Sequence, residues 1–202
     1  MFDALRKWCS DKNLRRQRLA ALALLIGSGV GLLASFVLSI EALTLAKNSH
    51  AILSCDLNAA ISCSVVANHW SATLLGFPNS FIGVMTLPVM VTIAVALLAG
   101  AKFPKWFMWG AQLGAVAGLL FAGWMFYMSY VEIGVLCPWC LTLDAGMLLI
   151  FYGLTRHNVL NKIIEHRGLR RFVDQGYDTL VLASVAALVI MAILAKFGSQ
   201  II

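Results

Sequence analysis

The sequence predicts an all-α integral membrane protein with five transmembrane helices. Of its 202 residues, 61% are hydrophobic and only 12% are charged, and the mean hydropathy is +0.87. A soluble domain carries about 25% charged residues, and a disordered chain needs low hydrophobicity, so both classes are excluded. No segment alternates as a barrel strand does, and an open sheet edge is not stable in lipid. A helical bundle remains.

Five apolar stretches reach or approach the roughly 20 residues that a helix needs to cross a bilayer. The first is too long, and the basic region before it too extended, for a cleaved signal peptide. The last is the shortest, and Lys196 after it can extend to the membrane interface. The five predicted spans are Leu19–Leu43, Phe81–Ala101, Trp106–Val131, Val135–Leu154 and Thr179–Ala195. The chain then divides into a basic N-terminus (1–18), a four-span unit (19–155) with a long loop (44–80), a basic connector (156–178) and a fifth span with a short tail (179–202).

The positive charge indicates a topology. All but two of the 15 Lys and Arg residues fall on one side of the predicted spans, the exceptions being Lys47 and Lys196. The positive-inside rule places that side, with the N-terminus, in the cytoplasm and the C-terminus outside. The net charge of +6 therefore reflects membrane orientation and does not point to nucleic acid. The connector Arg156–Asp178 mixes charges in a partly amphipathic pattern, which predicts an interfacial helix.

Four of the five cysteines fall on the predicted outer side, where disulfides form and persist. They are Cys55, Cys63, Cys137 and Cys140. Cys9 falls in the reducing cytoplasm, and we expect it to be an ordinary free thiol.

The motif Cys137-Pro138-Trp139-Cys140 stands at the outer start of the fourth span. Pro is favoured in the first helical turn, which predicts Cys137 at the cap and Cys140 in the first turn. The helix dipole there favours a thiolate, the species that attacks a disulfide or an electrophilic ring. A bond between these cysteines closes almost no loop and would stabilise the fold little. Redox chemistry is favoured over a structural disulfide or half of a metal site.

Cys55 and Cys63 lie in the long outer loop. Asn58 is a reasonable N-cap, and the residues after it predict a short amphipathic helix lying on the membrane, with Cys63 facing the bundle mouth. Residues eight apart on one helix are about 12 Å apart, too far for a disulfide, which needs roughly 7 Å. If the two pair, Cys55 must therefore lie on the lead-in before the helix. Such a pair suits a disulfide relay, and a static disulfide that holds the loop is the alternative.

Two polar residues could assist at the bundle mouth. Asn79 or Ser80 is predicted to cap the second span; if Ser80 does so, the Asn79 amide is free to bind a ligand. Asp144 is the one carboxylate well inside a predicted span, and it shares a helical face with Cys140. Because a carboxylate in lipid is costly, we hypothesise a proton-transfer role. The alternative is a structural acid hydrogen-bonded to Tyr127 or Tyr130.

Three segments in this order resemble the vitamin K epoxide reductase (VKOR) family in its bacterial form. They are Cys55-Asp56 followed by Ala60-Ile61-Ser62-Cys63-Ser64, then Asn79-Ser80-Phe81-Ile82-Gly83, then Cys137-Pro138-Trp139-Cys140. The resemblance covers about Leu19 to Leu154. It implies a multi-pass protein of the bacterial cytoplasmic membrane, with a four-helix bundle around a quinone site and a peripheral fifth helix.

The resemblance also implies a relay. An extracytoplasmic thioredoxin-like (DsbA-like) partner delivers electrons to Cys55 and Cys63, which reduce Cys137–Cys140 through a Cys63–Cys137 mixed disulfide. Cys140 then faces the quinone, menaquinone or ubiquinone, with Asn79 hydrogen-bonded to a quinone oxygen. The partner leaves oxidised and supports oxidative folding of secreted proteins. Because the chain stops soon after the fifth span, we expect the partner to act in trans. No metal is expected.

Some positions depart from the family pattern and leave alternatives open. A serine common in the family is His69 here, and the animal enzymes have an aromatic residue and a tyrosine where this chain has Ala67 and Asp144. These differences weaken the expectation of epoxide reduction, but not that of a thiol relay. The unrelated four-span quinone-linked disulfide generator has its C-x-x-C first, the reverse of the order here. A non-catalytic membrane protein with structural disulfides or a thiol metal site is the other alternative, although the Cys55–Cys63 spacing suits zinc poorly.

Overall fold

The computed structural model describes residues 12–201, and its main elements are five long helices. Each overlaps one predicted span, and all five are long and apolar enough to cross a membrane. Their bounds are Lys12–Lys47 (α2), Ser80–Leu98 (α4), Lys105–Tyr127 (α5), Pro138–Leu160 (α6) and Tyr177–Ile201 (α8). Among the described residues there is no β-strand beyond isolated bridges. The predicted fold class, an all-α membrane protein, is confirmed.

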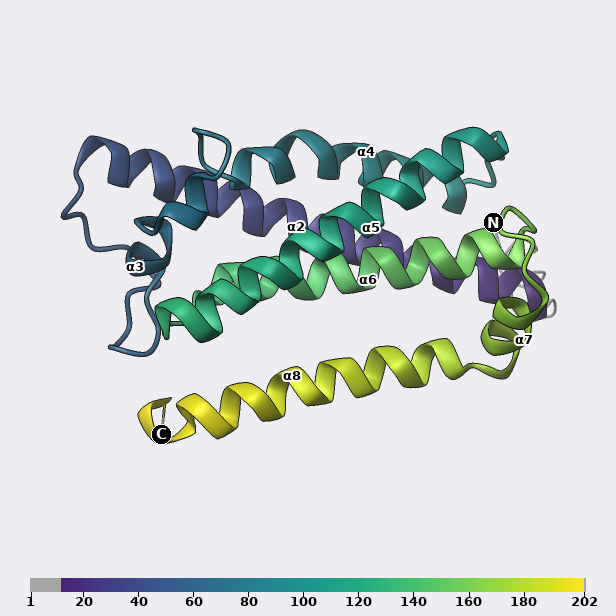
Figure 1. The fold of residues 1–202 in the computed structure, drawn as a ribbon. Helices are drawn as coiled ribbons and strands as arrows, with labels where there is room; N and C mark the ends of the chain where they lie inside the picture. Colours follow the sequence, from purple (N-terminus) through teal and green to yellow (C-terminus); the bar gives the residue numbers. More distant parts are fainter. Residues whose placement is uncertain (1–11, 202) are drawn as a thin grey trace, which may run out of the picture.

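Four of the long helices form a bundle, and the fifth lies at its side. Figure 1 shows α2, α4, α5 and α6 running alongside one another, with α8 set apart below α6. Among the bundle helices, α8 packs on α6. It is held at its far end by Tyr130, whose hydroxyl donates to Ala192 O at 3.1 Å and whose carbonyl accepts from Lys196 Nζ. Most of its apolar side chains, such as Leu188 and Met191, are exposed, as expected for a helix that faces lipid.

Glycine allows the backbones of α2 and α6 to pack closely. A Cβ atom at Gly27 would lie 2.7 Å from Gly146 O, and one at Gly153 would lie 2.6 Å from Ala20 O. Any larger residue would therefore force the two backbones apart. Small residues are therefore required along this contact between α2 and α6.

The opposite side of the bundle is loosely closed. Helix α4 packs on α2, and α5 packs on α6, whereas within the described chain α4 and α5 make few close contacts with each other. Because α4 and α5 are not packed tightly together, space remains inside the bundle between them. The cavity described below lies there.

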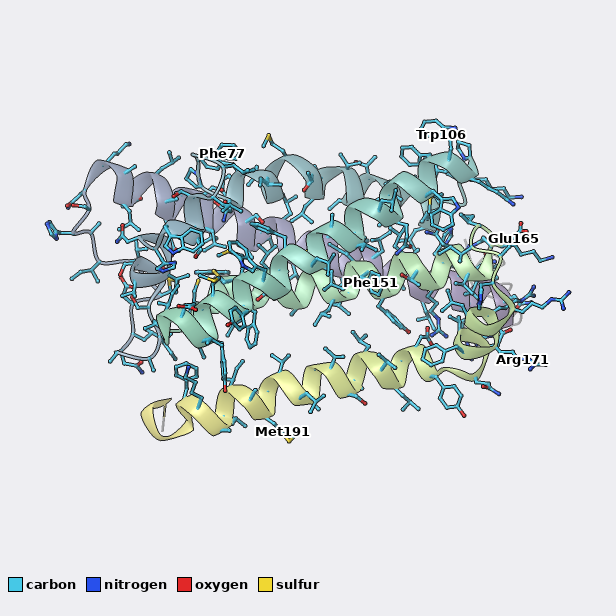
Figure 2. All side chains as sticks on the ribbon, in the orientation of Figure 1. Phe77, Trp106, Phe151, Glu165, Arg171 and Met191 are labelled. Carbon is cyan, nitrogen blue, oxygen red and sulfur yellow. A yellow bond between two sulfur atoms is a disulfide. The ribbon has the colours of Figure 1, made fainter. Side chains whose placement is uncertain are left out.

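The two ends of the bundle differ in chemistry. We call the end that holds α3 (Cys63–Ala67) the cysteine end and the opposite end, with α7 (Arg167–Gln175), the basic end. Figure 2 shows Phe77 toward the cysteine end, and Trp106, Glu165 and Arg171 at the basic end.

The connector at the basic end is only partly the predicted helix. Helix α6 continues through Arg156 to its end at residue 160, and only α7 forms a separate amphipathic helix. The side chain of Arg16, on α2, donates to Asp174 Oδ1 at 3.0 Å and to Val173 O at 2.9 Å. The connector is therefore anchored to the bundle by ion pairs and carbonyl contacts. Cys9 lies outside the described residues.

Candidate functional site

The loop at the cysteine end folds as two short helices rather than one. Helix α3 begins at Cys63, and Ser62 caps it by accepting a hydrogen bond from Val65 N at 3.3 Å. The prediction that Asn58 is the cap is wrong, because Asn58 Oδ1 accepts from the N–H groups of Ala60 and Ile61 at 2.9 Å each and closes a turn. Both residues are good caps, and the turn ahead of Ser62 decides between them. The rest of the predicted helix is a separate 3₁₀ turn, η1 (Trp70–Thr73).

Cys55 and Cys63 form a disulfide, with their Cα atoms 5.7 Å apart. Cys55 lies on the irregular segment before α3, as predicted for a bonded pair. Both residues are buried, with exposed fractions of 6% and 1%. An external thiol can therefore reach this bond only when the loop opens.

Asp56 holds the loop around the disulfide. Its Oδ1 accepts from Ser62 Oγ at 2.6 Å and Ser64 N at 3.0 Å, and its Oδ2 accepts from Leu53 N at 2.8 Å. Burial alone would raise the pKa of Asp56, but these hydrogen bonds outweigh it and lower the pKa to about 2. Nothing in the sequence pattern predicts this role for Asp56, whose carboxylate holds backbone and side-chain groups on both sides of the cysteine pair.

A short backbone pairing joins the loop to the start of α6. Ser62 N donates to Leu136 O at 3.0 Å, and Leu136 N donates to Ala60 O at 2.8 Å. The paired residues directly precede Cys63 in the loop and Cys137 in α6. The pairing therefore brings the two cysteines together, with Cys63 Sγ 3.4 Å from Cys137 Sγ. The structure thus brings the two predicted cysteine pairs into contact.

Cys137 and Cys140 occupy the predicted positions at the start of α6. Cys137 is the N-cap, Pro138 is the first helical residue, and Cys137 Sγ accepts from Cys140 N at 3.2 Å. Both are free thiols; Cys137 is 1% exposed, and Cys140 is partly buried. The helix N-terminus stabilises negative charge at this point, which suits thiolate chemistry.

A cavity of about 820 Å³ opens directly beneath the cysteines. Its volume lies in the range of sites that hold a small organic ligand. Its walls come from α2, α4, α5, α6 and the loop, and they are largely apolar. Ala67 forms part of the wall near the loop. The polar or reactive residues on its walls include Cys63, Asn79, Cys137, Cys140 and Asp144.

Asn79 lies at the cavity wall, and its side chain forms no capping hydrogen bond with α4. It occupies the N-cap position without a side-chain capping bond, and Ser80 Oγ instead accepts from Ser39 Oγ at 3.0 Å, so neither residue caps by its side chain. Asn79 Nδ2 donates to Ser71 O at 2.6 Å, while Asn79 Oδ1 is buried and has no hydrogen-bond partner among the described residues. His69 steadies the same segment, since its Nδ1 lies 2.9 Å from Ser71 Oγ. An amide held at one end and unpartnered at the other is free to bind a ligand.

Two carboxyl groups lie near the thiols. Asp144 lines the cavity, and in the described chain it makes no hydrogen bond with Tyr127 or Tyr130. Glu41, near the end of α2, was missed: its Oε1 lies 3.2 Å from Cys55 Sγ. Asp144 is therefore not the one carboxylate inside a span. The sequence signal that could have identified Glu41 is an acidic residue close to the end of an apolar stretch.

The Glu41 carboxylate and the sulfurs of Cys55 and Cys63 lie within 4.8 Å of one another, close enough to form a metal site. The two sulfurs are bonded to each other, and a disulfide sulfur has no thiolate to offer a metal. This cluster therefore suits redox chemistry in its oxidised form.

Comparison with known proteins agrees with this arrangement. The model of the vitamin K epoxide reductase family matches residues 22–155, about two thirds of the chain. The match includes all four cysteines, the cavity and the backbone pairing. No curated protein matches the chain.

Proposed function

The chain belongs to the vitamin K epoxide reductase family and is a membrane thiol oxidoreductase, and we propose that it carries electrons from an extracytoplasmic thioredoxin-like (DsbA-like) dithiol to a quinone. The partner would leave as a disulfide and oxidise secreted proteins. The observation that carries the proposal is the 3.4 Å contact between Cys63 Sγ and Cys137 Sγ, beside a cavity that Cys140 lines.

The first steps open the loop pair. A thiolate of the partner attacks Cys55, and the Cys55–Cys63 bond breaks with Cys63 as the leaving thiolate. Cys63 then attacks Cys137 of an oxidised Cys137–Cys140 pair, which it already touches. A Cys63–Cys137 bond forms, and Cys140 leaves as a thiolate. The partner's second thiol attacks its own bonded sulfur and releases Cys55.

The next step resets the loop pair. Cys55 attacks Cys63, the Cys55–Cys63 bond forms again, and Cys137 leaves as a thiolate. The product has a bonded loop pair and two free thiols at the start of α6, which is the combination of bonds in the structure. We interpret this state as the one that precedes quinone reduction.

The residues of the cavity fit a quinone. Its volume and apolar walls suit a flat lipid-soluble ring. The unpartnered Asn79 Oδ1 can accept from the hydroxyl of a reduced ring. The second N–H of Asn79 Nδ2, which meets only the weak acceptor Met125 Sδ at 3.8 Å, can donate to a ring oxygen. A bound quinone would supply the capacity to take up two electrons and two protons. Cys140 lines the cavity from the first turn of α6, and Asp144, one helical turn further along α6, would exchange protons there. The sparsely packed side between α4 and α5 offers access from lipid.

The test is anaerobic quinone reduction by the pre-reduced protein. We expect one menaquinone or ubiquinone to be reduced for each Cys137/Cys140 dithiol that is oxidised. The reaction is measured as the loss of quinone absorbance. Failure of the reduced wild-type protein to reduce either quinone would contradict the proposal. Stoichiometric zinc in the purified protein, without quinone reduction, would instead support a thiol metal site.

A further inference from the structure

Among the described residues, Glu41 is a buried carboxyl group that this relay leaves unused. Its side chain is 7% exposed, about two turns before the end of α2. Oε1 lies 3.2 Å from Cys55 Sγ and accepts from Ser54 Oγ at 3.5 Å, whereas Oε2 is buried without a partner among the described residues. No Lys or Arg in the described chain forms an ion pair with it. A buried carboxyl without a cation is costly and is commonly retained for function.

The two sulfurs of the loop disulfide have different neighbours. Cys63 Sγ contacts Cys137 Sγ, while Cys55 Sγ contacts Glu41 Oε1. When Cys63 bonds to Cys137, Cys55 is released beside a cluster of buried apolar residues that includes Leu45, Leu53 and Val66. A thiolate formed there is poorly solvated. The carboxyl of Asp56 is already occupied by three hydrogen bonds, so Glu41 is the ionisable group in contact with the released sulfur.

We infer that Glu41 is a catalytic acid and base for Cys55. In the opening direction, the Cys137 thiolate attacks Cys63, the Cys55–Cys63 bond breaks, and Cys55 takes the proton of the Glu41 carboxyl. In the closing direction, the Glu41 carboxylate removes that proton, Cys55 attacks Cys63, and Cys137 leaves as a thiolate. One disulfide breaks and one forms, so this exchange needs no external oxidant or reductant. The inference rests on the proposed relay, which it completes with a proton path on the loop side.

The exchange can be isolated in a Cys140→Ala background, where neither quinone nor a protein partner takes part. A maleimide alkylates Cys55 whenever it is released, and the Cys63–Cys137 bond can then no longer revert; we call this step locking. The maleimide concentration is raised until the locking rate no longer increases, so that the rate reports the release of Cys55. Mass spectrometry follows the locked product. Glu41→Gln keeps the shape of the side chain but removes the proton, and should slow locking roughly 100-fold, the usual size of a general acid–base contribution. Glu41→Asp retains an acid and should lock at an intermediate rate.

Glu132→Gln is the matched control, because Glu132 is an exposed carboxylate near the end of η2 (Met128–Ile133), on the segment that leads to α6. It should lock at the rate of the parent. With Cys140 present, pre-reduced Glu41→Gln protein should lose much less of its rate of quinone reduction than of its rate of locking, because electrons pass to quinone from the α6 pair and not from Cys55.

Three results would overturn the inference. They are equal locking rates in Glu41→Gln and its parent, a loss of the Cys55–Cys63 disulfide in Glu41→Gln, or an equal slowing of locking and of quinone reduction, since the last two indicate a structural role. Failure of wild-type protein to reduce quinone would overturn the proposed function alone, because the locking assay does not depend on it.

Discussion

The two cysteine pairs meet at one point but are held in different ways. Cys137 and Cys140 are fixed by a regular helix: the cap, the proline and the first turn follow from four consecutive residues. Cys55 and Cys63 are bonded across an irregular loop that depends on the Asp56 clamp and on a two-hydrogen-bond pairing with Leu136. The Cys137/Cys140 pair is held in place at the cavity by α6, whereas the loop that carries Cys55 and Cys63 can open when a few polar contacts are released. A carrier that must face both an external partner and the membrane interior requires this difference.

The largest expected effect separates the two pairs by function. With a small dithiol that reduces Cys137–Cys140 directly, Cys55→Ala protein should still reduce quinone, whereas Cys140→Ala should lose at least about 10³-fold in rate because its nucleophile is gone. The measurement is quinone absorbance under argon, with Cys9→Ser as the control. Equal losses of the quinone-reduction rate in the two variants would show that the two cysteine pairs do not have separate functions.

A smaller effect is expected from breaking the joint between the pairs. Leu136→Pro removes the N–H that donates to Ala60 O. A lost backbone hydrogen bond of about 1 kcal/mol corresponds to about a fivefold loss of the aligned loop, and Cys63–Cys137 exchange should slow by that factor. Leu136→Val, which keeps the N–H and most of the side-chain volume, should exchange at the wild-type rate. If the proline variant exchanges as fast, the pairing does not align the cysteines.

The smallest effect concerns the Asp56 clamp and its pH dependence. The pKa of Asp56 in the folded protein, about 2, lies below its ordinary value of 3.8. Its contribution to stability is therefore complete above pH 3.8 and is lost as the pH falls through about 2. Asp56→Asn should lower the Tm in detergent at pH 5 by a few degrees, and the difference from wild type should shrink toward pH 2. A Tm difference that stays constant over this range would contradict the role of the carboxylate.

The sequence was sufficient for the helices and for the α6 pair. Apolar length decides the five spans, and Pro138 after Cys137 decides the start of α6, because both signals are local. The loop was harder. Asn58 and Ser62 are both good caps, and the choice depends on the Asp56 contacts across the turn.

Two features of the site had no local signal. The pairing of Ile61 with Leu136 joins residues far apart in the sequence through backbone atoms that every residue has. Glu41 was overlooked because a carboxylate near a span end is easily assigned to the membrane interface, and only the folded loop shows that Cys55 covers it.

The most direct test of the relay is a cross-link between the two pairs. In Cys55→Ala/Cys140→Ala protein, mild oxidation should join Cys63 to Cys137 rapidly and nearly completely, as non-reducing peptide mass spectrometry would show. The matched Cys55→Ala/Cys137→Ala protein, which retains Cys63 and Cys140, should cross-link much more slowly. Equal cross-linking in the two proteins, or none between Cys63 and Cys137, would contradict direct transfer from the loop to α6.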